Sequence, residues 1–95
     1  MSVILSRTIH FHSPQDGFIS NTITKSYEGV APIVGAELED SAWHRNDIVK
    51  IETIYINTDQ PNHYYVELTS KKVESKDQVQ RYVEMAKHHG WNPLI

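Results

Sequence analysis

The sequence predicts a small α+β domain, in which about five short antiparallel strands form a meander and one C-terminal helix packs on it. Short segments rich in β-branched and aromatic residues are separated by clusters of turn-forming residues. A single amphipathic segment near the C-terminus has both a start and a stop signal. Five such strands can remain an open curved sheet or close into a small barrel. The strands are expected at about residues 3–12, 18–27, 33–40, 47–57 and 64–73, and the helix at about 76–89.

The helix is the element with the clearest local signals. Ser75 and Gln78 fit a capping box, in which each side chain bonds a free amide at the helix start. Gly90 suits the left-handed conformation that ends a helix, and Trp91 follows where a hydrophobic residue commonly folds back on the last turn. The apolar stripe at helical spacing consists of Val79, Tyr82, Val83 and Ala86. We expect it to pack on a sheet face built from Leu5, Ile9, Leu68 and Ile51 or Ile54.

The strands differ in how clearly they are marked. The first two are expected to form a hairpin around residues 13–17, where an Asp-Gly pair can take the positive φ angles of a tight connection. The stretch 33–40 has two interpretations: a strand bent at Gly35, which we favour, or a helix over residues 36–43. The segment 47–57 has apolar residues on both faces, which indicates a central strand.

Composition excludes several classes of function. The chain has 95 residues, enough for one domain, and no cysteine, so disulfides and thiolate chemistry are absent. Nine Lys and Arg against twelve Asp and Glu give a net charge of −3, which argues mildly against nucleic acid as the main partner. No apolar run approaches the ~20 residues that cross a bilayer, and the N-terminus lacks the features of a signal peptide. We expect a cytoplasmic protein with no membrane partner.

Six histidines are many for this length. His10 and His12 would project from the same face of a strand and could share a metal ion if a third ligand, such as His63, His44 or Asp40, came near. The alternative, which we favour, is that they lie on the polar face of a hairpin. The adjacent pair at 88–89 lies in the last helical turn, where positive charge suits the helix dipole.

A second candidate site is formed by His63, at the end of a turn, and by Tyr64 and Tyr65, which begin the last strand. A histidine beside two tyrosines could stack on the bases of a single-stranded nucleic acid. Tyrosines in strands more often serve packing, and the net negative charge counts against this function.

No catalytic constellation is present in the sequence. The acidic cluster of Glu37, Glu39 and Asp40 is typical of a solvated surface, and no glycine-rich phosphate loop occurs, so no cofactor is predicted. The function that we favour is a non-catalytic protein-interaction or accessory module, with another protein or a second copy as partner. It would act through a sheet edge or through the surface around Trp43 and Trp91, because tryptophan is enriched at interface hot spots. A metal-binding or histidine-dependent enzyme using His10 and His12 is the alternative.

One resemblance covers about residues 30 to 70. Its elements are Pro32-x-x-Gly35 leading into a strand, Ile48-Val49-x-Ile51, and Tyr64-Tyr65-Val66-Glu67-Leu68. These features resemble small SH3-like β-meander modules found among uncharacterised bacterial and phage proteins. The chain has Ala36 where such modules often carry an acidic residue after the glycine. The resemblance implies a small barrel and no particular activity or site, because a fold does not define a function.

Overall fold

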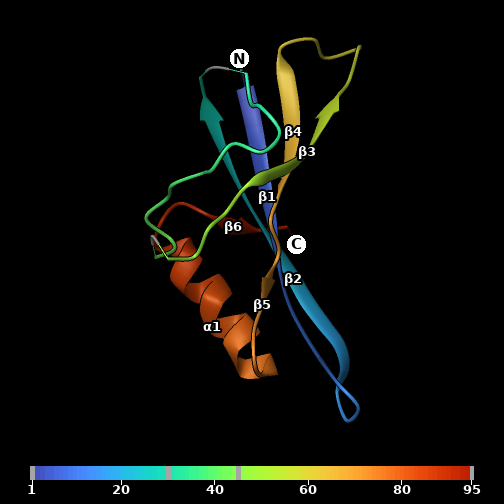
Figure 1. The fold of residues 1–95 in the computed structure, drawn as a ribbon, viewed down its shortest axis with the longest axis vertical. Coiled ribbons are helices and arrows are strands. Elements are labelled where there is room, and N and C mark those ends of the chain that lie inside the picture. The colour runs from blue at the N-terminus through green and yellow to red at the C-terminus, as the bar shows by residue number, and fades with distance from the viewer. Residues whose placement is uncertain (1, 30, 45, 95) are drawn as a thin grey trace.

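The chain folds as an α+β domain with a six-stranded mixed sheet and a C-terminal helix (Figure 1). The computed structural model describes residues 2–29, 31–44 and 46–94. Within these residues the sheet has the strand order β3-β4-β1-β2-β6, and β5 also pairs with β1. The elements are β1 (Ser2–Ser13), β2 (Gly17–Glu28), β3 (Ile51–Ile56), β4 (His63–Leu68), β5 (Lys71–Lys72), α1 (Lys76–Lys87) and β6 (Asn92–Pro93).

Two antiparallel hairpins make up most of the sheet. β1 and β2 pair along their whole length, from Ser2 opposite Glu28 to Ser13 opposite Gly17, and Gly17 has the positive φ of +71° that the tight turn requires. β3 and β4 form the second hairpin. The two hairpins meet through β1 and β4, which are parallel.

The sheet is open, with β3 at one end and β6 at the other. A meander would keep neighbouring strands in sequence order. In a meander, β3 would lie beside β2. Here the long connection between β2 and β3 leads to the other side of β1, so β4 lies beside β1 and β3 forms the edge. The described residues therefore form an open curved sheet and not the small closed barrel.

The strand expected at 33–40 does not form, and neither does the alternative helix over 36–43. The described part of this stretch is a loop with one isolated bridge, between Glu37 and Lys50. Gly35 has a φ of +91°, which interrupts an extended strand. The loop instead runs beside the start of β3, where the Gly35 amide donates to the Ile51 carbonyl at 2.8 Å.

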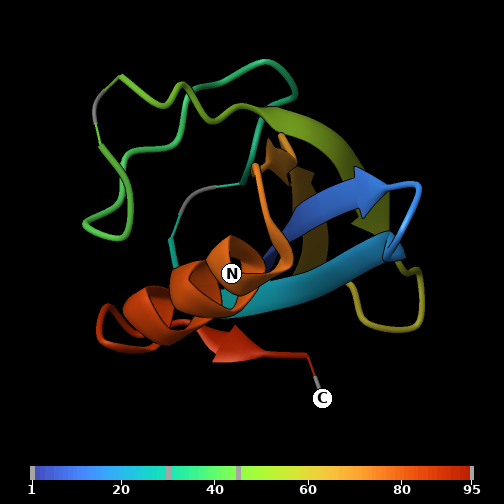
Figure 2. The ribbon, with the colours of Figure 1, turned by 90° about the horizontal axis from the view of Figure 1, so that it is seen from below.

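The hydrophobic core lies between one face of the sheet and a cover made by α1 and the 31–50 loop (Figure 2). From the helix, the buried residues are Val79, Val83 and Ala86. From the loop, Ala42 and Val49 are buried in the same cluster. The expected sheet residues Leu5, Ile9, Ile51 and Leu68 are buried there, and Ile54 packs on the cluster's margin.

The helix ends are built as their residue types predict. The Gln78 amide donates to Ser75 Oγ at 3.3 Å, and Gln78 Oε1 accepts from the Glu74 amide at 2.7 Å. After α1, Gly90 has a φ of +88°, and the Trp91 amide donates to the Ala86 carbonyl at 3.1 Å. Trp91 is 1% exposed, so the fold-back contact seals the end of the core. In the part of the chain that is described, no helix is long and apolar enough to cross a membrane.

Candidate interaction surface

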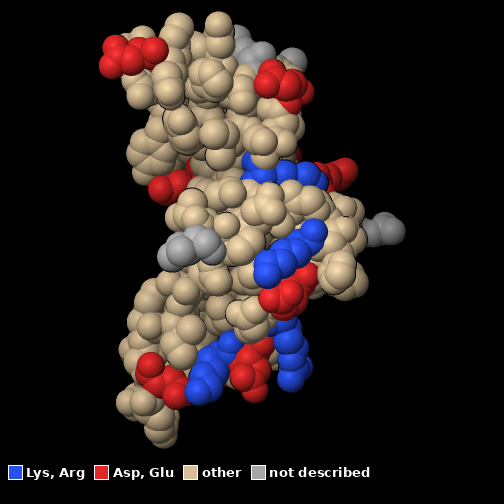
Figure 3. All heavy atoms as spheres, turned by 180° about the vertical axis from the view of Figure 1, so that it is seen from behind, with Lys and Arg blue, Asp and Glu red and all other residues tan. Residues whose placement is uncertain are grey.

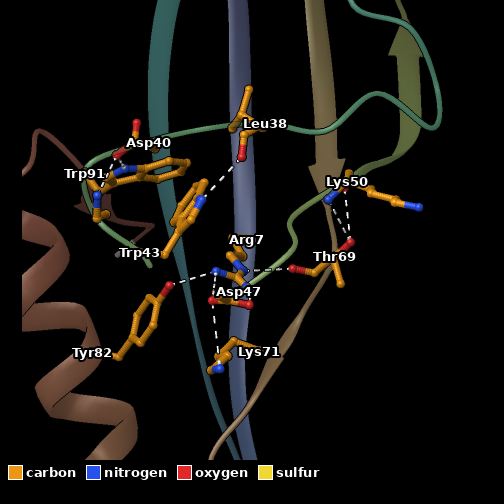
Figure 4. Close-up of polar contacts among 11 residues, drawn as sticks. Arg7, Leu38, Asp40, Trp43, Asp47, Lys50, Thr69, Lys71, Tyr82 and Trp91 are labelled. Carbon is orange, nitrogen blue, oxygen red and sulfur yellow. Dashed lines mark hydrogen bonds and ion pairs between the residues drawn. The ribbon is translucent and has the colours of Figure 1, made fainter. Parts of the chain in front are cut away.

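A buried arginine ties the sheet to its cover. Arg7 lies on the inward face of β1 between Leu5 and Ile9, and it is 1% exposed. Its Nε donates to the Thr69 carbonyl at 2.9 Å, and Nη1 donates to the Tyr82 hydroxyl at 2.7 Å (Figure 4). One guanidinium therefore joins β1, the residue after β4 and α1.

The same guanidinium forms a bidentate ion pair with Asp47 in the long loop. Nη1 donates to Asp47 Oδ2 at 3.0 Å and Nη2 donates to Oδ1 at 3.1 Å. The guanidinium carbon also lies 5.0 Å from the centre of the Trp43 ring. Burial alone would raise the pKa of Asp47, but hydrogen bonds from Arg7 and the positive charges of Arg7 and Lys71 outweigh it and lower the pKa. All three nitrogens of the Arg7 guanidinium donate hydrogen bonds to other residues of the chain, which indicates a structural role.

A second polar centre anchors both tryptophans. Asp40 accepts from Lys25 Nζ at 2.8 Å, from Trp91 Nε1 at 3.1 Å and from the Ala42 amide at 2.9 Å. The rings of Trp43 and Trp91 lie 5.3 Å apart. Because Trp91 is buried and Trp43 is half-buried against it, these residues stabilise the loop. A surface around them would not offer the Trp91 side chain to a partner.

The two partly buried carboxylates, Asp40 and Asp47, predict acid-sensitive stability. For Asp40, as for Asp47, burial would raise the pKa, but the hydrogen bonds from Lys25, Ala42 and Trp91 lower it below the ordinary 3.8. A depressed folded-state pKa adds stability that is present above the unfolded-state value and is lost as pH falls through the folded-state value. We expect the free energy of unfolding from urea titrations to be level between pH 7 and 5 and to fall below about pH 4. Asp40→Asn should make this fall shallower, and an unchanged slope would contradict the assignment.

The structure does not assemble a metal site from the predicted histidines. His10 stacks on Phe18 across the β1–β2 hairpin, with ring centres 5.8 Å apart, and His12 is exposed at the hairpin end. His63 pairs with Ser2, eight residues from His10 along β1, which is about 27 Å at the rise of a strand. Among the described residues, no group of three or more His, Asp or Glu side chains could hold a metal ion.

The predicted nucleic-acid residues are divided between the two faces of the sheet. Tyr64 packs against the core, whereas Tyr65 lies on the opposite face, where its hydroxyl donates to Gln60 Oε1 at 3.2 Å. Tyr65 lines a groove that contains the carboxylates of Glu52 and Glu67 and no Lys or Arg. On the side of the molecule drawn in Figure 3, basic side chains lie beside acidic ones and form no continuous basic stripe. This surface is poorly suited to a phosphate backbone.

The face of the sheet opposite α1 carries this shallow groove, of about 690 Å³. Its floor is rich in hydroxyl groups that bond within the sheet: those of Thr8 and Thr22 lie 3.0 Å apart, and Ser6 donates to the Val66 carbonyl at 3.1 Å. Tyr55 donates to Glu67 Oε1 at 3.0 Å, and this bond to a carboxylate raises the pKa of Tyr55. The hydroxyl groups of this face are satisfied within the sheet, and its aromatic residues, Tyr55 and Tyr65, lie on β3 and β4.

A second hollow, of about 620 Å³, lies in the long loop beside the acidic cluster. Glu37, Glu39, Asp40, His44 and Asp47 contribute to its lining. The partly buried carboxylates, Asp40 and Asp47, are paired with Lys25 and Arg7. These acids hold the loop in place and are not poised as a catalytic pair.

β3 forms one edge of the sheet. It pairs with β4 on one side, and along its other side the described residues supply a backbone partner only as far as Ile51. Tyr55 is 51% exposed and Ile56 is 69% exposed. Glu52 is the single charge between Ile51 and Ile56, and the strand has no Lys or Pro to discourage pairing with another chain.

The other end of the sheet is different, because β6 spans two residues and one of them is Pro93. The segment 47–57 was expected to be central because apolar residues lie on both of its faces. That prediction is wrong in position: its strand begins at Ile51 and forms the sheet edge.

Comparisons with protein-family models, with curated proteins and with solved structures find no match to this chain. The resemblance to SH3-like modules therefore stays a prediction. The exposed surfaces of the domain are what bears on its function.

Proposed function

We propose that this chain is a small, non-catalytic protein-interaction module that binds its partner along the outer edge of β3. The observation that carries the proposal is the edge itself, which combines backbone groups that have no partner among the described residues with the exposed side chains of Tyr55 and Ile56. An exposed edge strand is a template on which an extended segment of another chain can pair. Backbone hydrogen bonds supply affinity in this mode, and the alternate side chains supply specificity.

The surroundings of the edge support the same function. On the groove side, Tyr55 is directly opposite Tyr65 in the β3–β4 register, which gives an aromatic pair next to the edge. Tyrosine supplies a large contact area at low cost in conformational entropy. On the helix side, Ile56 lies opposite Tyr64 at the end of the strand and beyond the buried core.

Ile56→Lys is expected to abolish partner binding without unfolding the domain, because a lysine on an edge strand opposes pairing with a second strand. The matched control is Leu94→Lys, since Leu94 is 65% exposed and follows β6, at the opposite end of the sheet from β3. The measurement is quantitative mass spectrometry of proteins retained by the immobilised parent and by each variant.

We expect the partner, whether another protein or a second copy of the chain, to be retained by the parent and by Leu94→Lys and to be lost with Ile56→Lys. Equal retention by all three would overturn the proposed function. Circular dichroism of each variant checks that the fold is unchanged.

A further inference from the structure

We propose that the partner of β3 is a second copy of this chain, bound by antiparallel pairing of the two β3 strands about a two-fold axis at Tyr55. This inference rests on the proposed function, because it takes β3 to be the binding surface. It adds the identity of the partner and the register of the pairing.

The direction of the backbone groups along β3 follows from the ladder with β4. The Lys50 carbonyl accepts from the Thr69 amide at 2.9 Å, so Lys50 faces β4. The next residue, Ile51, faces outward, since its N–H and C=O bond to Ala36 and Gly35 in the loop. Without an irregularity, alternation would turn every even-numbered residue that follows toward β4.

The pairing register shifts between Ile51 and Thr53, as in a β-bulge. The shift reverses which residues turn their backbone groups toward β4. The N–H and C=O groups of Thr53 and Tyr55 therefore face β4, and those of Ile54 and Ile56 point outward. These outward groups begin where the loop leaves the edge and stop where the turn after Ile56 begins. The free edge thus consists of two residues placed symmetrically about Tyr55.

A segment with this symmetry complements itself. When two copies run antiparallel with Tyr55 opposite Tyr55, Ile54 of each copy lies opposite Ile56 of the other. In that register both outward residues form hydrogen-bonded pairs. A register centred on Ile54 would leave Ile56 opposite Glu52, which precedes the shift in the ladder. The hydrogen-bonding groups therefore select Tyr55 as the centre.

The side chains agree with this register. Two exposed apolar residues, Tyr55 and Ile56, become covered, and the cross-strand pairs are aromatic with aromatic and β-branched with β-branched. The axis is perpendicular to the sheet, so the two sheets become continuous and both helices lie on the same side.

Charge does not oppose the pairing although both copies are acidic. Glu52 of each copy lies opposite Thr58 of the other, which puts the two Glu52 residues about 20 Å apart along the strands. The two Glu67 residues are three strand spacings apart, about 14 Å. Both separations exceed the Debye length of about 10 Å at 0.1 M ionic strength.

The full chain tests the pairing directly through its mass in sedimentation equilibrium. We expect twice the mass of one chain for the parent and for Leu94→Lys, a change at the opposite end of the sheet. For Ile56→Lys we expect a dissociation constant about 100-fold higher or more, because the lysine would face Ile54 of the other copy. A parent that stays monomeric at the highest soluble concentration would overturn the inference.

The register is tested separately with a single cysteine, which is informative because the chain has none. Tyr55→Cys should give a disulfide-linked dimer under mild oxidation, since residues opposite each other in a non-hydrogen-bonded pair have adjacent Cβ atoms. Leu94→Cys, at an exposed position at the opposite end of the sheet, should remain monomeric on non-reducing gels. Dimers that form with no Tyr55→Cys crosslink would overturn the Tyr55 axis.

Failure of this inference differs from failure of the proposed function. A monomeric parent that still retains proteins lost by Ile56→Lys would overturn only the second copy as partner. A dimeric parent whose mass is unchanged by Ile56→Lys would overturn the role of the β3 edge in both.

Discussion

Asp47→Ala is expected to reduce the free energy of unfolding by about 3–5 kcal/mol, because it leaves the Arg7 guanidinium buried without its carboxylate. Arg7 is 1% exposed, so without Asp47 its guanidinium keeps only the Thr69 carbonyl and the Tyr82 hydroxyl as hydrogen-bond partners among the described residues. Domains of this size are stable by only about 5–15 kcal/mol. The loss would therefore be a large part of the total, measured by urea unfolding at pH 7.

A double replacement separates the ion pair from the site that it occupies. Arg7→Met combined with Asp47→Leu removes both charges and keeps apolar volume, and such exchanges are often close to neutral. We expect the double variant to be more stable than Asp47→Ala. The exposed Asp59→Ala serves as control and should change stability by less than about 0.5 kcal/mol. If Asp47→Ala unfolded at the same urea concentration as the parent, Arg7 would not be the buried link that the geometry indicates.

The sequence predicted the helix and its core-facing stripe because the signals are local. A cap, a 3.6-residue period and a terminal glycine all act within a few residues, so tertiary contacts are not needed to recognise them. The capping contact at Ser75 and the buried Trp91 show the same local chemistry in the structure. The α+β class was predictable for the same reason.

The long-range features were not predictable in this way. Arg7 interrupted an apolar alternation in β1, and its burial depends on partners far away in the sequence, such as the loop residue Asp47, forty positions away. The stretch 33–40 has the composition of a strand, yet it is part of the long loop. That loop carries Asp40, Trp43 and Asp47 to the core face.

The candidate site was missed for a similar reason. Apolar residues on both faces of β3 favoured a central strand, because burial is the usual explanation for such a pattern. An edge that pairs with another chain gives the same pattern, since its apolar side chains are covered only in the complex. The available signal was the combination of Tyr55 and Ile56 with the absence of Lys and Pro. The metal-site prediction for His10 and His12, by contrast, rested on their spacing in the sequence alone.

Val83→Asp is expected to cost about 3–5 kcal/mol, because it places a carboxylate where the side chain is 1% exposed, between α1 and the sheet. Burial would raise the pKa of the introduced carboxyl in the folded state, so the deficit relative to the parent should narrow as pH falls below that value. The control is Gln80→Asp on the exposed side of α1, which should cost less than about 1 kcal/mol. Thermal melts at pH 7 that differ by only a few degrees would show that the stripe does not face the core.

Val83→Asp and Ile56→Lys test the core and the edge of β3 separately. Both changes introduce a charge at an apolar position, but Val83 is closed off by the sheet and Ile56 is open to solvent. Val83→Asp should therefore unfold the domain at lower urea, whereas Ile56→Lys should leave the monomer's unfolding free energy within about 0.5 kcal/mol of the parent. With the fold intact, loss of binding by Ile56→Lys can be assigned to the edge of β3.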